Sequence, residues 1–394
     1  MIDVARARAD TPGCRDVVHL NNAGAALPTR AVLDAVVEHL ELEARVGGYM
    51  AADLVAERSA AVYESVAALI GASADEIALV ENATRAWDMV AYSLGASFRP
   101  GDRVLTSQAE YASNVIALLQ LARRTGASLE VVPDDDTGQL SVDALRELLD
   151  ERVRLVAMSW IPTQGGLVNP AAAVGAVTRA AGVPYLLDAC QAAGQLPIDV
   201  DALGCDFLSA TGRKYLRAPR GTGLLYVRRE WIDRLEPPFL DVHAAEWAHG
   251  DKVVPRDDAR RFESWERSVA NQLGLGAAVD YALALGVDAI AARVVGLAAS
   301  LREQLADVPG VALHDRGVER CGLVTFTIDG VDVYELAASL RAQAINISVS
   351  TIDFARYDFE ARGLEAVARA SVHYYNTEDE LARLVDAVAT APRA

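Results

Sequence analysis

Between about residues 75 and 230 the sequence alternates short apolar runs with longer segments of helical periodicity, and this pattern constrains the fold more than any other feature. Segments such as Ser141–Asp150 and Asn169–Ala181 have helical periodicity and begin near a capping residue type. Such alternation predicts an α/β fold, with a mostly parallel seven-stranded central sheet and helices on both faces. The seven buried strands are expected at Ile77–Val80, Arg103–Thr106, Leu129–Val132, Leu155–Ser159, Tyr185–Asp188, Phe207–Ala210 and Gly223–Val227.

The pattern changes after about Val269, where two long apolar helices are expected at Asn271–Leu285 and Asp288–Leu305. A chain of 394 residues is too long for one small core. We therefore expect a large domain over residues 20–268 and a smaller α+β C-terminal domain formed by residues 1–19 and 269–394. The polar stretch His249–Arg261 is expected to be a long functional loop. The remaining predicted elements are Leu323–Ile328, Val333–Gln343, Ile345–Ser350, Ala368–His373 and Thr377–Thr390.

The charge balance and the cysteines exclude several classes of function. The net charge of -18 argues against nucleic-acid binding, which needs clusters of Lys and Arg. The first residues lack the apolar core of a signal peptide, and charges interrupt the most apolar stretches, so no membrane contact is expected. The expected location is the cytoplasm. The cysteines are scattered without metal-binding spacing, which favours a reducing compartment and predicts no metal site: Cys14, Cys190, Cys205 and Cys321.

Two polar residues follow predicted strands closely. Asp188 ends an apolar strand, the place where doubly wound sheets bind their ligands, and a buried carboxylate there needs a donor or a cation as its partner. Lys214 follows another strand and precedes a Gly-containing return, Arg217–Gly223. Each residue also has an ordinary structural interpretation, as a helix cap for Asp188 and as a solvated side chain for Lys214.

A third segment, Glu81–Ala86, connects the first predicted strand to a helix. Its backbone N–H groups and the Thr84 hydroxyl suit a phosphate at the helix N-terminus. Taken alone, this segment is also typical of a simple capped helix. The segment supports a phosphate site mainly because it occurs together with Asp188 and Lys214 and precedes both in the sequence.

These segments resemble the class V aminotransferase-fold enzymes, which use pyridoxal 5′-phosphate (PLP) and have PLP fold type I. The resemblance covers nearly the whole chain, and the motifs occur in family order. Arg213 and the segment Glu43–Tyr49 are similar to the branch of ergothioneine C–S lyases and isopenicillin N epimerase-like enzymes within the cysteine desulfurase superfamily. The matching segments are Asn21–Gly24, Asn82–Thr84, Asp188–Gln191, Ser209–Lys214, Gly221–Gly223, Arg369–Ser371 and Tyr375–Thr377.

The resemblance implies a role for each matching residue. Lys214 would hold PLP as a Schiff base, Asp188 would pair with the pyridine nitrogen, and Gln191 would bond the ring hydroxyl. Tyr111 would stack on the ring and belongs with Lys214 and Asp188 to the expected catalytic group. A homodimer is implied, with the partner's loop near Arg261–Arg267 reaching toward the phosphate. The phosphate would be surrounded by Ala83, Thr84, Thr211 and Arg213, and the substrate would contact Arg369, Tyr49 and Asn22, with Arg369 clamping its carboxylate.

One departure from the family directs the expected function. Desulfurases of this family carry a cysteine nucleophile where this chain has Ser348–Asp353, which contains no cysteine. Cys190 and Cys321 are expected to be core residues. We therefore expect a lyase that cleaves the Cβ–S bond of an S-substituted cysteine or its sulfoxide, releasing a thiol, pyruvate and ammonia. Tyr49 and two tryptophans, Trp247 and Trp265, are expected either to pack a dimer contact or to receive a bulky thiol half.

Other functions use the same residues and stay open. An aminotransferase, an epimerase or a decarboxylating enzyme would act on an amino acid with the same cofactor. The epimerase needs a second acid or base, for which Tyr111 or His243 is a candidate. Outside catalysis, a PLP-binding regulator or a nucleotide-binding α/β protein is conceivable, but the sequence has no DNA-binding module, no G-x-G-x-x-G after an early strand and no P-loop.

Overall fold

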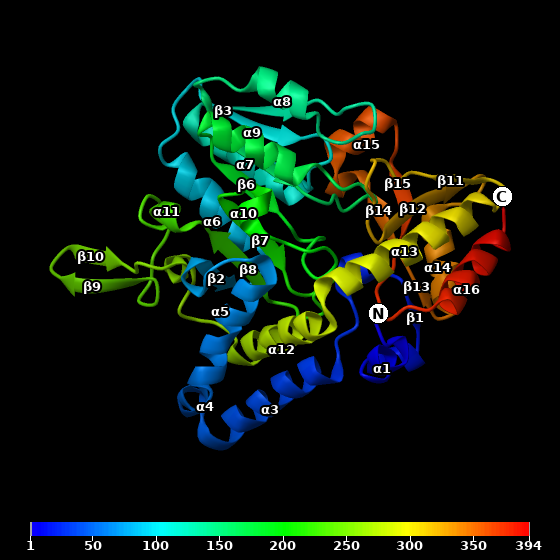
Figure 1. Ribbon diagram of the computed structural model, residues 1–394, viewed down its shortest axis with the longest axis horizontal. Coiled ribbons are helices and arrows are strands. Elements are labelled where there is room, and N and C mark those ends of the chain that lie inside the picture. The colour runs from blue at the N-terminus through cyan, green and yellow to red at the C-terminus, as the bar shows by residue number, and fades with distance from the viewer. Residues whose placement is uncertain (1, 394) are drawn as a thin grey trace.

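The computed structural model describes residues 2–393, and its centre is a seven-stranded sheet (Figure 1). Neighbouring strands among β3 to β7 run parallel, whereas β8 is antiparallel to both β7 and β2. The predicted α/β fold is confirmed, with β8 as the antiparallel exception. In spatial order the strands are β2 (Ile77–Val80), β8 (Gly223–Val227), β7 (Phe207–Thr211), β6 (Tyr185–Asp188), β5 (Val153–Ser159), β3 (Arg103–Ser107) and β4 (Ser128–Val132).

Helices cover both faces of this sheet, and this explains why its strands read as continuous apolar runs. Leu186 belongs to the hydrophobic cluster on one face, together with Trp87 and Leu118 of α6 and α7. The next residue, Leu187, belongs to the cluster on the other face, together with Val174 of α9. The helices that alternate with the strands are α6 (Ala83–Gly95), α7 (Ala112–Thr125), α8 (Val142–Leu148), α9 (Ala171–Ala181) and α10 (Val200–Leu203).

A second, antiparallel sheet lies beside the first, at the right of Figure 1. Its strands, in order, are β11 (Val311–Leu313), β12 (Leu323–Ile328), β15 (Ala366–Ser371) and β14 (Ser348–Thr351). The single strand predicted over Ile345–Ser350 is wrong. The chain instead forms β13 (Ile345–Asn346), which pairs with β1 (Val18–His19) near the N-terminus, and then β14. The helices of this region are α13 (Val287–Ala306), α14 (Val333–Ala342), α15 (Arg356–Arg362) and α16 (Glu378–Ala389).

Four helices bear on the predicted division into domains. One of them, α12, was predicted from the sequence, and the other three were not. α12 (Val269–Leu285) lies against α3 (Arg30–Val46) and α5 (Ala56–Ile70), with α4 (Gly48–Leu54) between the last two in the chain (Figure 1). The predicted boundary at residue 269 therefore falls at the start of a helix that contacts the predicted large domain, and the division itself stays a prediction.

Among residues 2–393, no single helix has both the length and the hydropathy to cross a membrane. α12 and α13 meet these two requirements only when taken as a pair, and the pair is bent by 81°.

The polar stretch predicted as a loop contains a hairpin that projects from the body of the molecule (Figure 1). β9 (Ala245–His249) pairs with β10 (Lys252–Pro255), and a short 3₁₀ helix, Ala259–Phe262, follows. The loop prediction was therefore wrong over most of this stretch. The remaining short elements are α1 (Val4–Ala9), α2 (Asn22–Ala25), α11 (Arg229–Ile232) and the 3₁₀ helices Pro12–Arg15, Ala74–Glu76 and Ile352–Phe354.

Candidate active site

One cavity of about 340 Å³ lies at the carboxyl ends of β5, β6 and β7 and at the N-terminus of α6. All eight residues predicted to bind the cofactor line it: Ala83, Thr84, Tyr111, Asp188, Gln191, Thr211, Arg213 and Lys214. Parallel strands bring their carboxyl ends to one edge, so residues far apart in the sequence meet there. The structure therefore brings the predicted residues together, while their individual roles stay predictions. The cavity is also lined by residues not predicted for it: Asn82, Asn114, Ser159, Ile161, Thr163 and Cys190.

Asp188 is the last residue of β6 and is 6% exposed. Its Oδ1 accepts the backbone N–H of Cys190 at 2.8 Å, and its Oδ2 accepts Nδ2 of Asn114 at 2.9 Å. Both donors are neutral groups. A buried carboxylate held by neutral donors favours a cationic partner in the cavity, such as a protonated ring nitrogen.

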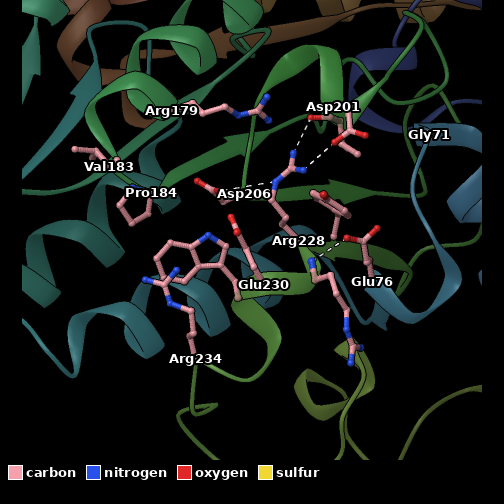
Figure 2. Close-up of a pocket in the computed structure, with 15 residues that line it drawn as sticks. Gly71, Glu76, Arg179, Val183, Pro184, Asp201, Asp206, Arg228, Glu230 and Arg234 are labelled. Carbon is pink, nitrogen blue, oxygen red and sulfur yellow. Dashed lines mark hydrogen bonds and ion pairs between the residues drawn. The ribbon is translucent and has the colours of Figure 1, made fainter.

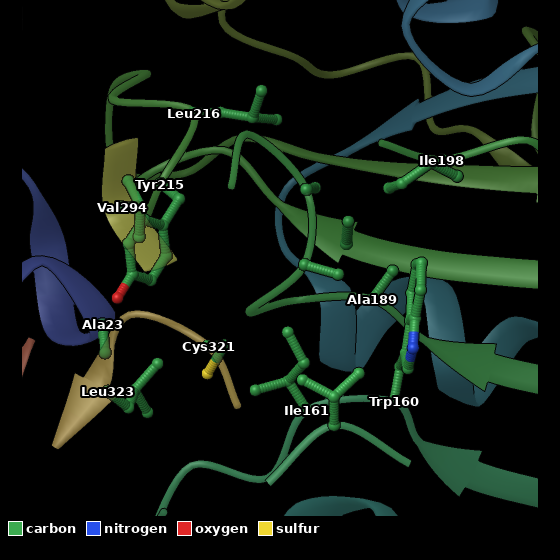
Figure 3. Close-up of a cluster of buried hydrophobic side chains, with 14 of the residues drawn as sticks. Ala23, Trp160, Ile161, Ala189, Ile198, Tyr215, Leu216, Val294, Cys321 and Leu323 are labelled. Carbon is green, nitrogen blue, oxygen red and sulfur yellow. The ribbon is translucent and has the colours of Figure 1, made fainter. Parts of the chain in front are cut away.

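Lys214 follows β7 on a turn that is anchored by buried neighbours. Tyr215 and Leu216 are each 1% exposed, and Figure 3 shows them in the cluster that also contains Val294 and Cys321. Burial lowers the pKa of the Lys214 amine, although Cys190 and Asp188 act in the opposite direction. A lower pKa leaves more of the amine unprotonated, which is the form that attacks an aldehyde.

The chain continues through Arg217, which has a φ of 65° and reverses direction after the lysine. Its buried guanidinium donates to the carbonyl of Leu27 at 2.7 Å and to the Tyr374 hydroxyl at 2.6 Å. These contacts fix the lysine turn to the N-terminal segment and to the turn that follows β15.

The other end of the cavity has the features of an anion site. α6 begins at Ala83, and the Asn82 side chain caps it by accepting the N–H of Arg85 at 2.9 Å. The N–H groups of the first turn, together with the helix dipole, favour a phosphate there. Arg213 adds a guanidinium, one nitrogen of which donates to the carbonyl of Gly24. The Thr211 hydroxyl donates to the Thr222 carbonyl at 3.2 Å, so its predicted phosphate contact requires a change of partner.

Gln191 offers a direct test of whether these residues fit PLP. The residue is 2% exposed, and its Nε2 donates to the carbonyl of Ala23 at 3.2 Å. Its Oε1 is buried and lacks a hydrogen-bond partner among the described residues. A ring hydroxyl beside Gln191 would supply that partner. With Asp188, Lys214 and the helix N-terminus, the donor set of the cavity fits PLP.

Arg369 is the predicted residue that is best placed for a substrate carboxylate. It lies on β15, and its guanidinium donates to the Thr163 carbonyl at 2.7 Å, to the Thr163 hydroxyl at 2.8 Å and to the Ser348 hydroxyl at 3.1 Å. Thr163 itself lines the cavity. Burial lowers the pKa of Arg369 to about 10, which leaves the guanidinium charged at neutral pH.

None of the three predicted substrate residues is part of the cavity lining, although Arg369 bonds Thr163, which is. Asn22 is buried, and its amide already bonds the carbonyls of His19 and Ser371 and the hydroxyl of Tyr375. Tyr49 lies on α4 and is 76% exposed. The sequence motifs could not show this, because they do not reveal which neighbours satisfy an amide or where an unpredicted helix lies.

A larger groove, of about 640 Å³, lies at the opposite edge of the sheet, where the parallel strands begin (Figure 2). Its charged residues largely satisfy one another. Arg228 donates to Asp201 at 2.8 Å and lies 3.8 Å from Asp206, and the Arg229 N–H donates to Glu76 at 2.8 Å. The smaller cavity, with its lysine and its unpartnered glutamine oxygen, is therefore the candidate active site.

Comparisons with known proteins identify the family to which the chain belongs. The family model described as aminotransferase class-V matches residues 18–384. A probable cysteine desulfurase 2 of Mycobacterium leprae is 33% identical, over 99% of this chain and 97% of its own length. The solved cysteine desulfurase CsdA of Escherichia coli, in an S-sulfonic acid form, is 26% identical with a TM-score of 0.92, over 98% of both chains. A solved C-DES mutant with glycine covalently linked to its PLP cofactor is 22% identical, with a TM-score of 0.88 over 97% of this chain and 99% of its own.

These relatives overturn the predicted activity. The sequence analysis expected a lyase for S-substituted cysteines, with an aminotransferase, an epimerase or a decarboxylating enzyme as alternatives, whereas the relatives are named cysteine desulfurases. The lyase and epimerase-like branch is likewise unsupported by them. The prediction gave too much weight to the missing cysteine at Ser348–Asp353, where Ser348 holds Arg369 instead. Cys190 was also misplaced, because it lines the cavity and is not a core residue.

Proposed function

Because the chain belongs to the aminotransferase class-V family and takes PLP as its cofactor, we propose that it removes sulfur from free cysteine. The observation that carries this proposal is the similarity to proteins named cysteine desulfurases, which extends over almost the full length of both chains. The cavity supports it with a lysine and a buried carboxylate around one small volume, and Arg369 bonds Thr163 of its lining.

Each residue of the cavity has a defined task in such a reaction. Bound PLP supplies a ring that accepts electrons from the substrate's Cα. Arg369 orients the substrate by its carboxylate, since Thr163 and Ser348 hold the guanidinium in place. Lys214 would move protons at Cα and Cβ. This task needs an unprotonated amine, which burial favours.

The sulfur must pass to a thiol, and the cavity provides no good resident acceptor. Among the cysteines of residues 2–393, Cys190 is the one that lines the cavity. Burial and the neighbouring Asp188 carboxylate raise the pKa of its thiol, which keeps it protonated and weakly nucleophilic. We therefore assign the acceptor role to an external thiol. The Cβ–S bond of cysteine breaks, an S–S bond forms to the acceptor, and a proton adds at Cβ, so that cysteine and a thiol yield alanine and a persulfide.

Product analysis tests this function. The PLP-loaded protein is incubated with cysteine and dithiothreitol, and alanine, sulfide, pyruvate and ammonia are quantified. We expect alanine and sulfide in equal amounts, because excess dithiothreitol reduces the persulfide to sulfide and becomes a disulfide. Without dithiothreitol, a second cysteine is the remaining external thiol, so alanine formation should slow and cysteine persulfide should form, while mass spectrometry should find no extra sulfur on Cys190. Pyruvate and ammonia in place of alanine would contradict desulfuration, and a persulfide on Cys190 would contradict the external acceptor.

We also propose that the protein is a homodimer, as the family resemblance implied. Exposed apolar side chains lie on α3 and α4. Among them, Leu40 is 51% exposed, Tyr49 is 76% exposed and Leu54 is 69% exposed. Several exposed apolar side chains on neighbouring helices favour a protein contact. The partner's loop near Arg261–Arg267 was predicted to reach toward the phosphate. Arg261 itself does not suit this role, because it is buried and donates to the carbonyls of Arg256 and Ile232. Sedimentation of the purified protein at twice the monomer mass is the expected result, and a monomer at all concentrations would contradict it.

A further inference from the structure

A second buried carboxylate lies behind the cavity and has no part in the function described above. Glu110 stands just before α7 and is 1% exposed. Its Oε1 accepts the backbone N–H of Tyr111 at 2.8 Å, and its Oε2 accepts the backbone N–H of Ser159 at 2.7 Å. Further donors are the hydroxyl of Ser159 and, at 3.4 Å, the hydroxyls of Thr106 and Ser107. Each of these groups can donate to Glu110, and the two backbone N–H groups can only donate, so both carboxyl oxygens serve as acceptors.

Asn114 connects this carboxylate to the cavity. Its Nδ2 donates to Oε1 of Glu110 at 2.9 Å and to Oδ2 of Asp188, also at 2.9 Å. An amide nitrogen has two protons, so one serves each carboxylate. Asn114 is 2% exposed and lines the cavity. Glu110 thereby fixes which end of the Asn114 amide faces Asp188, because the opposite orientation would place the amide oxygen against both carboxylates.

We propose that Glu110 is a positioning residue that acts through Asn114 to hold the Asp188 carboxyl oriented toward the pyridine nitrogen of PLP. The charge of Glu110 adds negative potential at Asp188, and this favours a protonated ring nitrogen. The proposal rests on PLP binding in this cavity and is independent of whether cysteine is the substrate.

The electrostatics of the cluster are consistent with this role. Burial and the nearby Asp188 raise the pKa of Glu110 to about 7, against the hydrogen bonds of Ser159 and Asn114, which lower it. Tyr185 on β6 also faces Glu110, and burial keeps its hydroxyl protonated. Burial thus outweighs the surrounding donors, so Glu110 is only partly ionised near neutral pH, and a change in those donors changes its charge and the potential at Asp188.

Glutamine is the most informative substitution at position 110. The side chain keeps its shape but replaces one acceptor oxygen by an NH₂ group. Because the backbone N–H groups of Ser159 and Tyr111 can only donate, Glu110→Gln must turn its NH₂ either toward the Ser159 N–H or toward the Tyr111 N–H and the Asn114 amide, which must then turn over. In the first case a buried donor loses its acceptor, and in the second Asp188 loses the Asn114 donor.

The test uses PLP labelled with ¹⁵N at the ring nitrogen, bound to the protein. In Glu110→Gln we expect the ¹⁵N resonance to shift toward that of the unprotonated ring, and PLP to bind at least about tenfold more weakly. Asn114→Ala should give the same direction of shift, and the double variant should show little additional change, since both act through one contact. Glu130→Gln, on β4, is the matched control, and its resonance should match that of the wild type.

Circular dichroism shows which variants fold. If Glu110→Gln does not, Asn114→Ala alone carries the test, because it removes the bridge and leaves the other donors to Glu110 in place. An unchanged ¹⁵N resonance in a folded variant would overturn the proposal, as would effects of Glu110→Gln and Asn114→Ala that simply add. Neither readout requires turnover, so a failure of the proposed desulfuration is recognised separately, by the absence of alanine.

Discussion

Replacing Lys214 by alanine is expected to lower turnover by about four orders of magnitude. The variant loses the amine that binds the cofactor covalently and the group that moves protons at the substrate. The chain has two lysines, Lys214 and Lys252, and Lys252 lies exposed on the β9–β10 hairpin. No second amine in the described cavity can therefore replace the first. The measurement is kcat/KM of the PLP-loaded variant, with the cofactor's absorption spectrum recorded alongside.

Lys252→Ala is the matched control, since it removes the same functional group at a distant surface position and should keep wild-type kinetics. Lys214→Arg separates charge from reactivity, because an arginine stays protonated and cannot act as a base at neutral pH. We expect both substitutions at position 214 to be inactive. Appreciable turnover in either variant would contradict the role of Lys214.

Asp188→Asn should retain the fold and bound PLP but lose about 10²- to 10³-fold in kcat. Asparagine is nearly the same size, and it can still accept the N–H of Cys190 through its side-chain oxygen. It lacks the negative charge that stabilises a protonated ring nitrogen, and its NH₂ group opposes the Nδ2 of Asn114, which bonds Asp188 in the wild type. The loss should fall mainly on kcat, because Arg369, which Thr163 holds in place, remains available for the substrate carboxylate.

Steady-state kinetics with cysteine measure this split. The same variant should move the ¹⁵N resonance of labelled PLP further than Glu110→Gln does, since Asp188 contacts the ring and Glu110 acts at a distance. Near-normal turnover of Asp188→Asn would show that the carboxylate serves only to hold the end of β6.

The central sheet could be predicted from the sequence because its strands are buried on both faces and stand out as apolar runs. The same reasoning did not separate β13 from β14, since Ile347, between them, continues the apolar pattern while the chain changes sheets. The helices α3 to α5 were missed because no strand alternates with them and their contacts with α12 lie more than 200 residues away in the sequence.

At the site, the sequence indicated the residues that end strands or start helices, since topology alone brings those together. It did not indicate what lies behind them. Glu110 directly precedes Tyr111 in the sequence, but its burial depends on contacts with residues of β3 and β5. Cys190 was expected in the core but lines the cavity, whereas Asn22 was expected at the substrate but does not line the cavity. In both cases packing, and not residue type, decides which side chains of a short segment face the cavity.

Reduction of the PLP-loaded protein with borohydride, followed by peptide mapping, tests the central claim most directly. Reduction makes the bond between the cofactor and a lysine permanent, and the chain has only two lysines to distinguish. The account predicts that the label is found on the peptide that contains Lys214 and that Asp188, Gln191 and the N-terminus of α6 surround it in the cavity. A label on Lys252, or no covalent label on a protein that still binds PLP, would contradict it.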